Sequence, residues 1–157
     1  MKVYLSKINE SWIIDRMRKE WYEHNSEVST EKINESDIIW IISPWLWKKL
    51  PKRYLKKNKV VCSIYHFEEK DFERDSLKDF YKRDSYVDEY HVISPYIEKD
   101  LRNLTTKPIT YIPFWVNESI WFNIPDKSNL RKKYNIDEKS YLIGCLLYTS
   151  PSPRDLD

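Results

Sequence analysis

The chain has 157 residues, of which 41% are hydrophobic and 33% are charged, and its formal net charge is +2. This length is enough for one domain with a sizeable core, and the balance of charge and hydrophobicity excludes an intrinsically disordered protein. The small net charge gives no signature of a polyanion-binding protein, so we expect no nucleic acid partner.

Aromatic residues are the unusual part of the composition, at 15% with seven Trp and twelve Tyr. This is more than a core of this size needs. One interpretation is a surface on which a sugar stacks or a partner packs. The other is that Tyr replaces different half-buried residues in a sequence rich in Ile, Lys, Asn and Tyr, and the sequence leaves both open.

Glycine and cysteine exclude further classes of protein. The single glycine, Gly144, excludes a phosphate-binding loop near the N-terminus. Cys62 and Cys145 do not suggest a disulfide, and no cluster of His and Cys has metal-ligand spacing, so no metal site and no cofactor are expected. No apolar run reaches membrane-spanning length and the first residues lack a signal-peptide core, so we expect a cytoplasmic protein.

The first part of the chain predicts a strand, a helix and a buried strand. Val3 and Leu5 indicate a short first strand, and Ser11 can begin a helix with an apolar stripe. That stripe is Trp12, Ile13, Met17 and Trp21. The run DIIWIISPW, from Asp37 to Trp45, is continuously apolar and suits a central parallel strand covered on both faces.

The next stretch, WLWKKLPKRYLKK, mixes aromatic and basic residues. Pro51 breaks any single helix there. An amphipathic helix or irregular loop with solvated lysines is one interpretation, and a nucleic-acid surface is a second. A third is peripheral contact with an anionic membrane or a lipid-linked acceptor at the inner face of the membrane.

The run KVVCSIYHF is the clearest strand, with Val60, Cys62 and Ile64 suited to burial. His66 follows near its carboxyl end. Ligands of open α/β sheets gather outside the carboxyl ends of the strands, so His66 is better placed for chemistry than His24 or His91. A structural role is the alternative for a lone histidine. The following stretch, EEKDFERDSLKDFYKRDSYVD, predicts a surface helix.

The stretch from Tyr86 to Asn117, YVDEYHVISPYIEKDLRNLTTKPITYIPFWVN, predicts a strand, a helix and a second parallel strand. Ser94 offers a hydroxyl N-cap and Pro95 a first helical residue whose missing N–H costs nothing. With the preceding strands, this pattern predicts an α/β fold with a parallel sheet flanked by helices.

The same stretch resembles the last βαβ unit of the N-terminal domain in GT-B glycosyltransferases, especially the retaining group 1 or family 4-like enzymes. The matching residues are Asp88, Val92, Ser94, Leu101, Lys107, Ile112, Pro113, Val116 and Asn117. One departure is visible, because the family carries Asn-Gly after the proline where this chain has Phe114-Trp115. These aromatics are either an acceptor platform or core packing.

The resemblance implies a Rossmann-like acceptor-side domain over residues 1–117. It further implies an interdomain linker and the first strand of a missing donor domain over 118–144, with that strand at Tyr141–Ile143. The run CLLYTSPSPRD, residues 145–155, resembles the conceptual translation of a transposase-type sequencing adapter. We therefore expect 145–157 to be a non-native tail and the natural protein to continue beyond Gly144; a natural Ser/Pro-rich tail is the alternative.

The function implied by the resemblance is sugar transfer from a nucleotide-sugar donor to a carbohydrate or glycan acceptor, by a fragment that is inactive alone. His66 is the candidate catalytic residue. The candidate residues of the acceptor cleft are Ser43, Pro44, Ser94, Phe114, Trp115 and Asn117. The alternative is a stand-alone Rossmann-like or flavodoxin-like interaction domain without catalysis.

Overall fold

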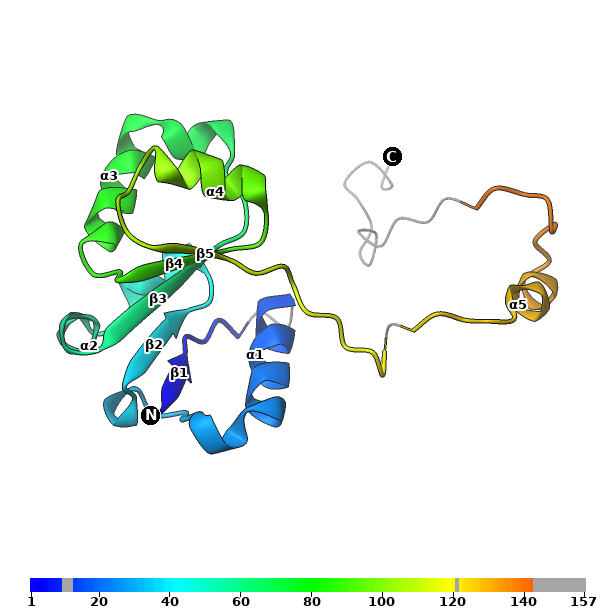
Figure 1. Cartoon of the computed structure of the whole chain (residues 1–157), viewed down its shortest axis with the longest axis horizontal. Helices are drawn as coiled ribbons and strands as arrows, with labels where there is room; N and C mark the ends of the chain where they lie inside the picture. The colour runs from blue at the N-terminus through cyan, green and yellow to red at the C-terminus, as the bar shows by residue number, and fades with distance from the viewer. Residues whose placement is uncertain (10–12, 121, 143–157) are drawn as a thin grey trace. The chain divides into compact units, whose positions relative to one another are not determined.

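The computed structural model of the chain describes residues 1–9, 13–120 and 122–142 (Figure 1). The chain divides into two compact units, Met1–Trp115 and Val116–Asp157, which are described separately. The expected boundary at residue 117 lies two positions beyond this division. The expected adapter-derived tail, 145–157, lies outside the described residues.

The first unit is built on a five-stranded, all-parallel sheet in the order β1-β2-β3-β4-β5. The predicted α/β, Rossmann-like fold is confirmed. The strands are β1 (Val3–Leu5), β2 (Ile38–Ile41), β3 (Lys59–Ile64), β4 (Glu89–Val92) and β5 (Ile109–Tyr111). The helices are α1 (Ile13–His24), α2 (Lys52–Lys57), α3 (Arg74–Asp84) and α4 (Pro95–Arg102), with short 3-10 turns η1 (Ser26–Val28), η2 (Ile33–Glu35), η3 (Pro44–Lys49) and η4 (Glu69–Phe72).

Local sequence signals explain several of these boundaries. Pro51 separates η3 from α2, as predicted. Ser94 is the N-cap of α4, and its Oγ accepts a hydrogen bond from the backbone N–H of Tyr96 at 3.2 Å. Asp88 precedes β4, and its Oδ2 accepts from the backbone N–H of Val60 at 2.7 Å. The carboxylate thereby ties the start of β4 to β3.

The strand register divides the sheet into two faces. One, called the Trp40 face, carries Leu5, Trp40, Val61, Ser63 and His91; the other, the Tyr90 face, carries Ile39, Ile41, Cys62, Ile64, Tyr90 and Val92. Helix α1 covers the Trp40 face, where Trp21 packs edge-on against Trp40 with ring centroids 5.1 Å apart. Helix α3 covers the Tyr90 face, where Phe80 stacks on Tyr90 at 6.0 Å. Both faces are therefore covered by helices (Figure 1).

This two-sided arrangement arises from a detour of the chain after α1. Ser29 forms an isolated parallel bridge with Val3, and the backbone N–H of Thr30 donates to the carbonyl of Val3 at 3.0 Å. The partner strand β2 instead meets the opposite edge of β1, where Ile38 donates to the carbonyl of Lys2. Crossovers between parallel strands are right-handed. The chain runs from β1 through α1 to Ser29 on one edge of β1, and then continues from β2 toward β5 on the other edge. The two directions therefore place α1 and α3 on opposite faces of the sheet. The winding direction reverses between β1 and β2, and this is a topological switch point.

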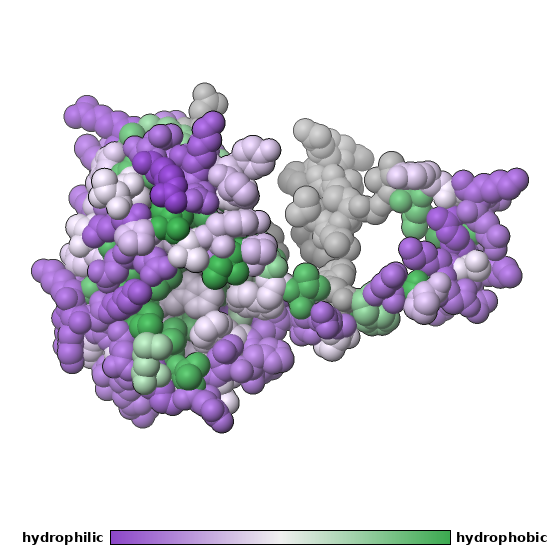
Figure 2. Space-filling view, viewed as in Figure 1, coloured by the Kyte–Doolittle hydropathy of each residue, from purple (hydrophilic) through white to green (hydrophobic). Residues whose placement is uncertain are grey.

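The core of the first unit is apolar and extends over both faces of the sheet. Fully buried side chains include Leu5, Met17, Ile41, Tyr90 and Leu101. Burial raises the pKa of the Cys62 thiol to about 12, so Cys62 acts as a small apolar core residue, as predicted. The face of the molecule shown in Figure 2 is largely hydrophilic, with apolar residues gathered in small groups.

The second unit contains α5 (Lys127–Lys133), whose N-cap Asp126 accepts from the backbone N–H of Asn129 at 3.2 Å. Tyr141 and Leu142 form no strand, and Ile143 lies outside the described residues. A strand is stable only when its backbone groups pair with a neighbour, and no partner strand is described in this unit. None of the described helices is both long and apolar enough to span a bilayer.

Candidate functional site

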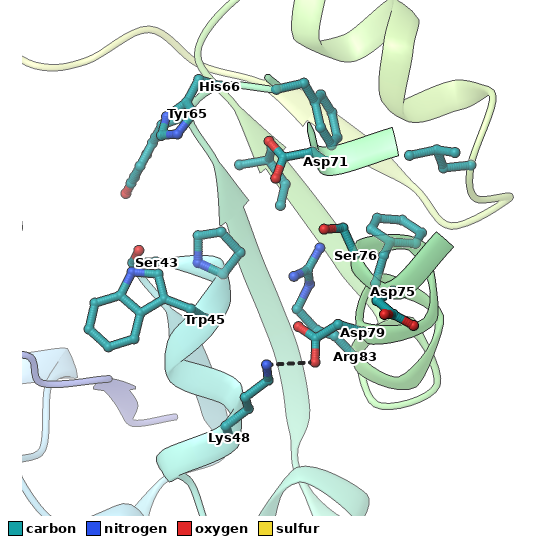
Figure 3. Close-up of a pocket in the computed structure, with 15 residues that line it drawn as sticks. Ser43, Trp45, Lys48, Tyr65, His66, Asp71, Asp75, Ser76, Asp79 and Arg83 are labelled. Atoms are coloured by element: carbon teal, nitrogen blue, oxygen red, sulfur yellow. Dashed lines mark ion pairs between the residues drawn. The ribbon is translucent and has the colours of Figure 1, made fainter. Parts of the chain in front are cut away.

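The main candidate site is a cavity of about 580 Å³ at the carboxyl ends of β2 and β3, next to the switch point (Figure 3). This volume lies in the range of small-molecule sites, about 300–1,000 Å³. One wall is formed by the residues that follow β2, the second by those that follow β3, and the third by α3. Across the switch point, Ser6 Oγ accepts from the backbone N–H of Ile42 at 3.0 Å and holds the ends of β1 and β2 together.

Three sequence-predicted site residues meet in this cavity. Ser43 and Pro44 enter it from the end of β2, and His66 enters it from the end of β3. The His66 side chain is 72% exposed, and its Nε2 lies 3.7 Å from Oε1 of Glu68. The loop after β3 is stabilised by a capping box in which Asp71 Oδ2 accepts from the backbone N–H of Glu68 at 2.8 Å. His66 is thus held at the solvent-facing mouth of the site.

Aromatic rings and polar groups of both signs line the cavity together. Trp45, exposed to 39%, and Tyr65 supply aromatic surface. Burial raises the pKa of the Tyr65 phenol to about 12, so this hydroxyl stays neutral near pH 7. Lys48 Nζ lies 2.8 Å from Oδ1 of Asp79, whose other oxygen accepts from the indole of Trp47 at 3.4 Å. The cavity can therefore both donate hydrogen bonds to a polar ligand and accept them from it.

Arg83 is the functional candidate that sequence reasoning missed. It lies on α3 and lines the cavity, yet only 7% of it is exposed. Figure 3 shows its guanidinium extending from α3 toward Ser76. A signal for it existed, because Ser76, Asp79 and Arg83 are spaced three and four residues apart and so share one face of a helix. A basic residue on the same face as the buried Phe80 points inward.

The other predicted site residues lie outside this cavity. Ser94 caps α4. Phe114 packs on Tyr65 with ring centroids 5.1 Å apart, so it reaches the cavity only through that ring. Trp115 lies over the Trp40 face, 6.5 Å from Trp40 between centroids. Asn117 belongs to the second unit, where its Oδ1 accepts from the backbone N–H of Ser119 at 3.1 Å.

A second, apolar hollow of about 340 Å³ lies on the Trp40 face and contains His91. His91 Nε2 is 2.9 Å from the carbonyl of Ile112, which can only accept, so Nε2 carries the proton of the neutral ring. Its Nδ1 then accepts from Ser63 Oγ at 2.9 Å, while Ser63 accepts from the indole of Trp40 at 2.7 Å. Burial lowers the pKa of His91. Because Ser63 is fully buried, this Ser-His pair orders the sheet and offers no nucleophile to a ligand.

Comparison of the chain with protein-family models, with curated proteins and with solved structures gives no match. Over residues 1–9, 13–120 and 122–142, no three His, Cys, Asp or Glu side chains gather in a way that could hold a metal ion. Any function must therefore be argued from the cavity and from the motif over residues 86–117.

Proposed function

We propose that the chain forms the acceptor-side domain of a glycosyltransferase that uses a nucleotide-sugar donor. The observation that carries the proposal is the cavity at the carboxyl ends of β2 and β3, next to the switch point of a parallel sheet. Its mixture of aromatic rings, carboxylates and cations suits a ligand that is polar on its edges and apolar on its faces, as a sugar is. The motif at 86–117 supports the same assignment.

In this proposal His66 acts on the acceptor. Its imidazole is exposed at the cavity mouth and can accept a hydrogen bond or a proton from an acceptor hydroxyl. Glu68 Oε1 lies 3.7 Å from Nε2 of His66, close enough to orient the ring. Trp45 provides the ring on which the sugar stacks, and Ser43 provides a hydroxyl at the same wall. The diphosphate of the donor would be held by a second domain, as the resemblance implies.

The loop that follows β2 also fits peripheral membrane contact by an enzyme of this kind. Lys48, Lys49 and Lys52 lie close together in sequence, and Lys49 Nζ lies 4.7 Å from the centre of the exposed ring of Trp45. Lysines beside an exposed tryptophan are typical of proteins that touch anionic lipid surfaces. The proposal accordingly includes a lipid-linked acceptor presented at such a surface.

The test begins with re-reading the gene at codon 144. We expect an open frame that continues, and we expect the longer protein to transfer sugar from a nucleotide-sugar panel while the 157-residue chain does not. In the longer protein, His66→Gln should lower kcat/KM by about 100-fold, since general acid–base catalysis contributes about that much or more. His24→Gln on α1 is the matched control and should leave the rate unchanged. A stop codon at this point, or transfer by the short chain, would contradict the proposal and favour a stand-alone interaction domain.

A further inference from the structure

The cavity holds a buried cation, Arg83, for which no ion pair is found among the described residues. Only 7% of Arg83 is exposed, and its Nε has no hydrogen-bond partner in the described part of the chain. Its guanidinium makes a cation–π contact with Phe80, whose ring centre lies 5.1 Å from the guanidinium carbon. Arginine stays protonated at any ordinary pH, so this position carries a permanent positive charge.

A buried charge without a partner is costly, and proteins compensate for it with a counter-ion or a ligand. The carboxylates that line the cavity make other contacts, and none of them forms a described ion pair with Arg83. Asp79 is paired with Lys48 at 2.8 Å, Asp75 lies 3.3 Å from Lys78, and Asp71 accepts the backbone N–H of Glu68. Arg83 is left with its guanidinium directed into the cavity (Figure 3).

We propose that Arg83 is an oxyanion-binding residue and that the ligand of this cavity carries a carboxylate or a phosphate group. Guanidinium groups bind both anions through two parallel N–H···O bonds, which are stronger and more directional than neutral hydrogen bonds. Ser76, on the same face of α3, provides a hydroxyl beside the guanidinium for a third contact. The inference rests on the proposed function for the identification of the ligand as a sugar. It adds that this acceptor sugar is acidic or phosphorylated.

Binding of simple sugars to the 157-residue chain tests the inference directly. The probes are glucose, glucuronate, glucose 6-phosphate and inorganic phosphate, each titrated against uniformly ¹⁵N-labelled protein. We expect glucuronate or glucose 6-phosphate to bind at least tenfold more tightly than glucose, and we expect the Arg83 Nε–H resonance to shift on saturation. The two acidic sugars distinguish a carboxylate site from a phosphate site, and inorganic phosphate shows whether the sugar ring contributes.

Variants separate Arg83 from the general charge of the protein. Arg83→Met should remove the preference for the acidic sugar, whereas Arg83→Lys should retain part of it with at least threefold weaker binding. Arg102→Met is the matched control, because Arg102 pairs with Glu98 on α4 and does not line the cavity. If Arg83→Met does not fold, the Arg83→Lys affinity and the wild-type Nε–H shift still decide the matter.

Three outcomes would overturn the inference. The first is equal affinity for glucose and both acidic sugars, and the second is an Arg83 Nε–H resonance that does not shift on saturation. The third is a preference for the acidic sugar that is as large in Arg83→Met or Arg83→Lys as in wild type. None of these readouts depends on sugar transfer. A chain that binds glucuronate through Arg83 while the longer protein transfers nothing would contradict the proposed function and leave the anion site standing.

Discussion

The indole Nε1 of Trp115 donates a hydrogen bond to Oε2 of Glu20 at 2.8 Å, across 95 positions of sequence. Glu20 is only 4% exposed, so this bond ties the exit of β5 to the inner face of α1. Trp115→Phe keeps most of the ring packing against Trp40 and removes the donor. We expect the free energy of unfolding to fall by about 1–3 kcal/mol, measured by urea denaturation, because a buried carboxylate loses a hydrogen bond.

Trp45→Phe is the control for this substitution, because Trp45 is exposed and changes there cost less than about 0.5 kcal/mol. Equal stability of Trp115→Phe and wild type would mean that the hydrogen bond from Trp115 to Glu20 contributes nothing to stability, and it would favour the role of an acceptor platform for this residue.

The buried His91 makes stability depend on pH. Its pKa is lowered in the folded protein, so the unfolded chain binds the proton more readily in the window below its ordinary pKa of about 6.5. Above that pH, the free energy of unfolding contains the full contribution of neutral His91. As pH falls through the window, the free energy of unfolding decreases by at most about 1.4 kcal/mol per pH unit.

We therefore expect urea midpoints to fall between pH 7 and pH 5 and the His91→Gln variant to show a shallower fall. His66→Gln should keep the wild-type slope, since His66 is exposed. Identical slopes in wild type and His91→Gln would contradict the assignment.

Ser94 is expected to act through the helix that it caps. Removal of the hydroxyl in Ser94→Ala should cost about 1 kcal/mol, because the N–H of Tyr96 loses its acceptor, whereas Ser94→Asp should restore most of the stability. Thermal unfolding followed by circular dichroism measures both. An unchanged stability in Ser94→Ala, together with weaker sugar binding, would instead support a direct role in the acceptor site.

Cys62 should react with thiol reagents only when the protein unfolds. Its side chain is fully buried and its pKa is raised to about 12, so almost no thiolate exists at pH 8. In a Cys145→Ser chain, we expect no reaction with Ellman's reagent under native conditions and one equivalent in 6 M guanidinium. Rapid native labelling of that variant would show that the sheet opens locally around β3.

The sequence predicted the strands of the sheet well because each was marked by its own residues. The apolar run at 37–45 and the run at 59–67 became β2 and β3, and Ser94-Pro95 began α4 as expected. The detour through Ser29 could not be predicted, since a single bridge leaves no hydrophobic pattern. The strand expected at Tyr141–Ile143 needs partner strands, and the second unit has none among its described residues.

The candidate site was predicted only in part, because its residues come from three segments. Ser43 and Pro44 follow β2 and His66 follows β3, and the rule for strand ends places both segments at one edge of the sheet. Arg83 lies in a stretch dense with charges, where composition alone gives no reason to select one arginine. The spacing of Ser76, Asp79 and Arg83 places them on one face of α3, but only the packing of Phe80 against Tyr90 shows that this face is turned inward.

The bridge at Ser29 also limits how this sheet can associate with others. It occupies the carbonyl of Val3 on the outer edge of β1, where a strand from another molecule would otherwise pair. The opposite edge is β5, only three residues long and bracketed by Pro108 and Pro113, which cannot donate to a neighbouring strand. Both rims are therefore protected against edge-to-edge aggregation, despite a chain rich in isoleucine and tyrosine.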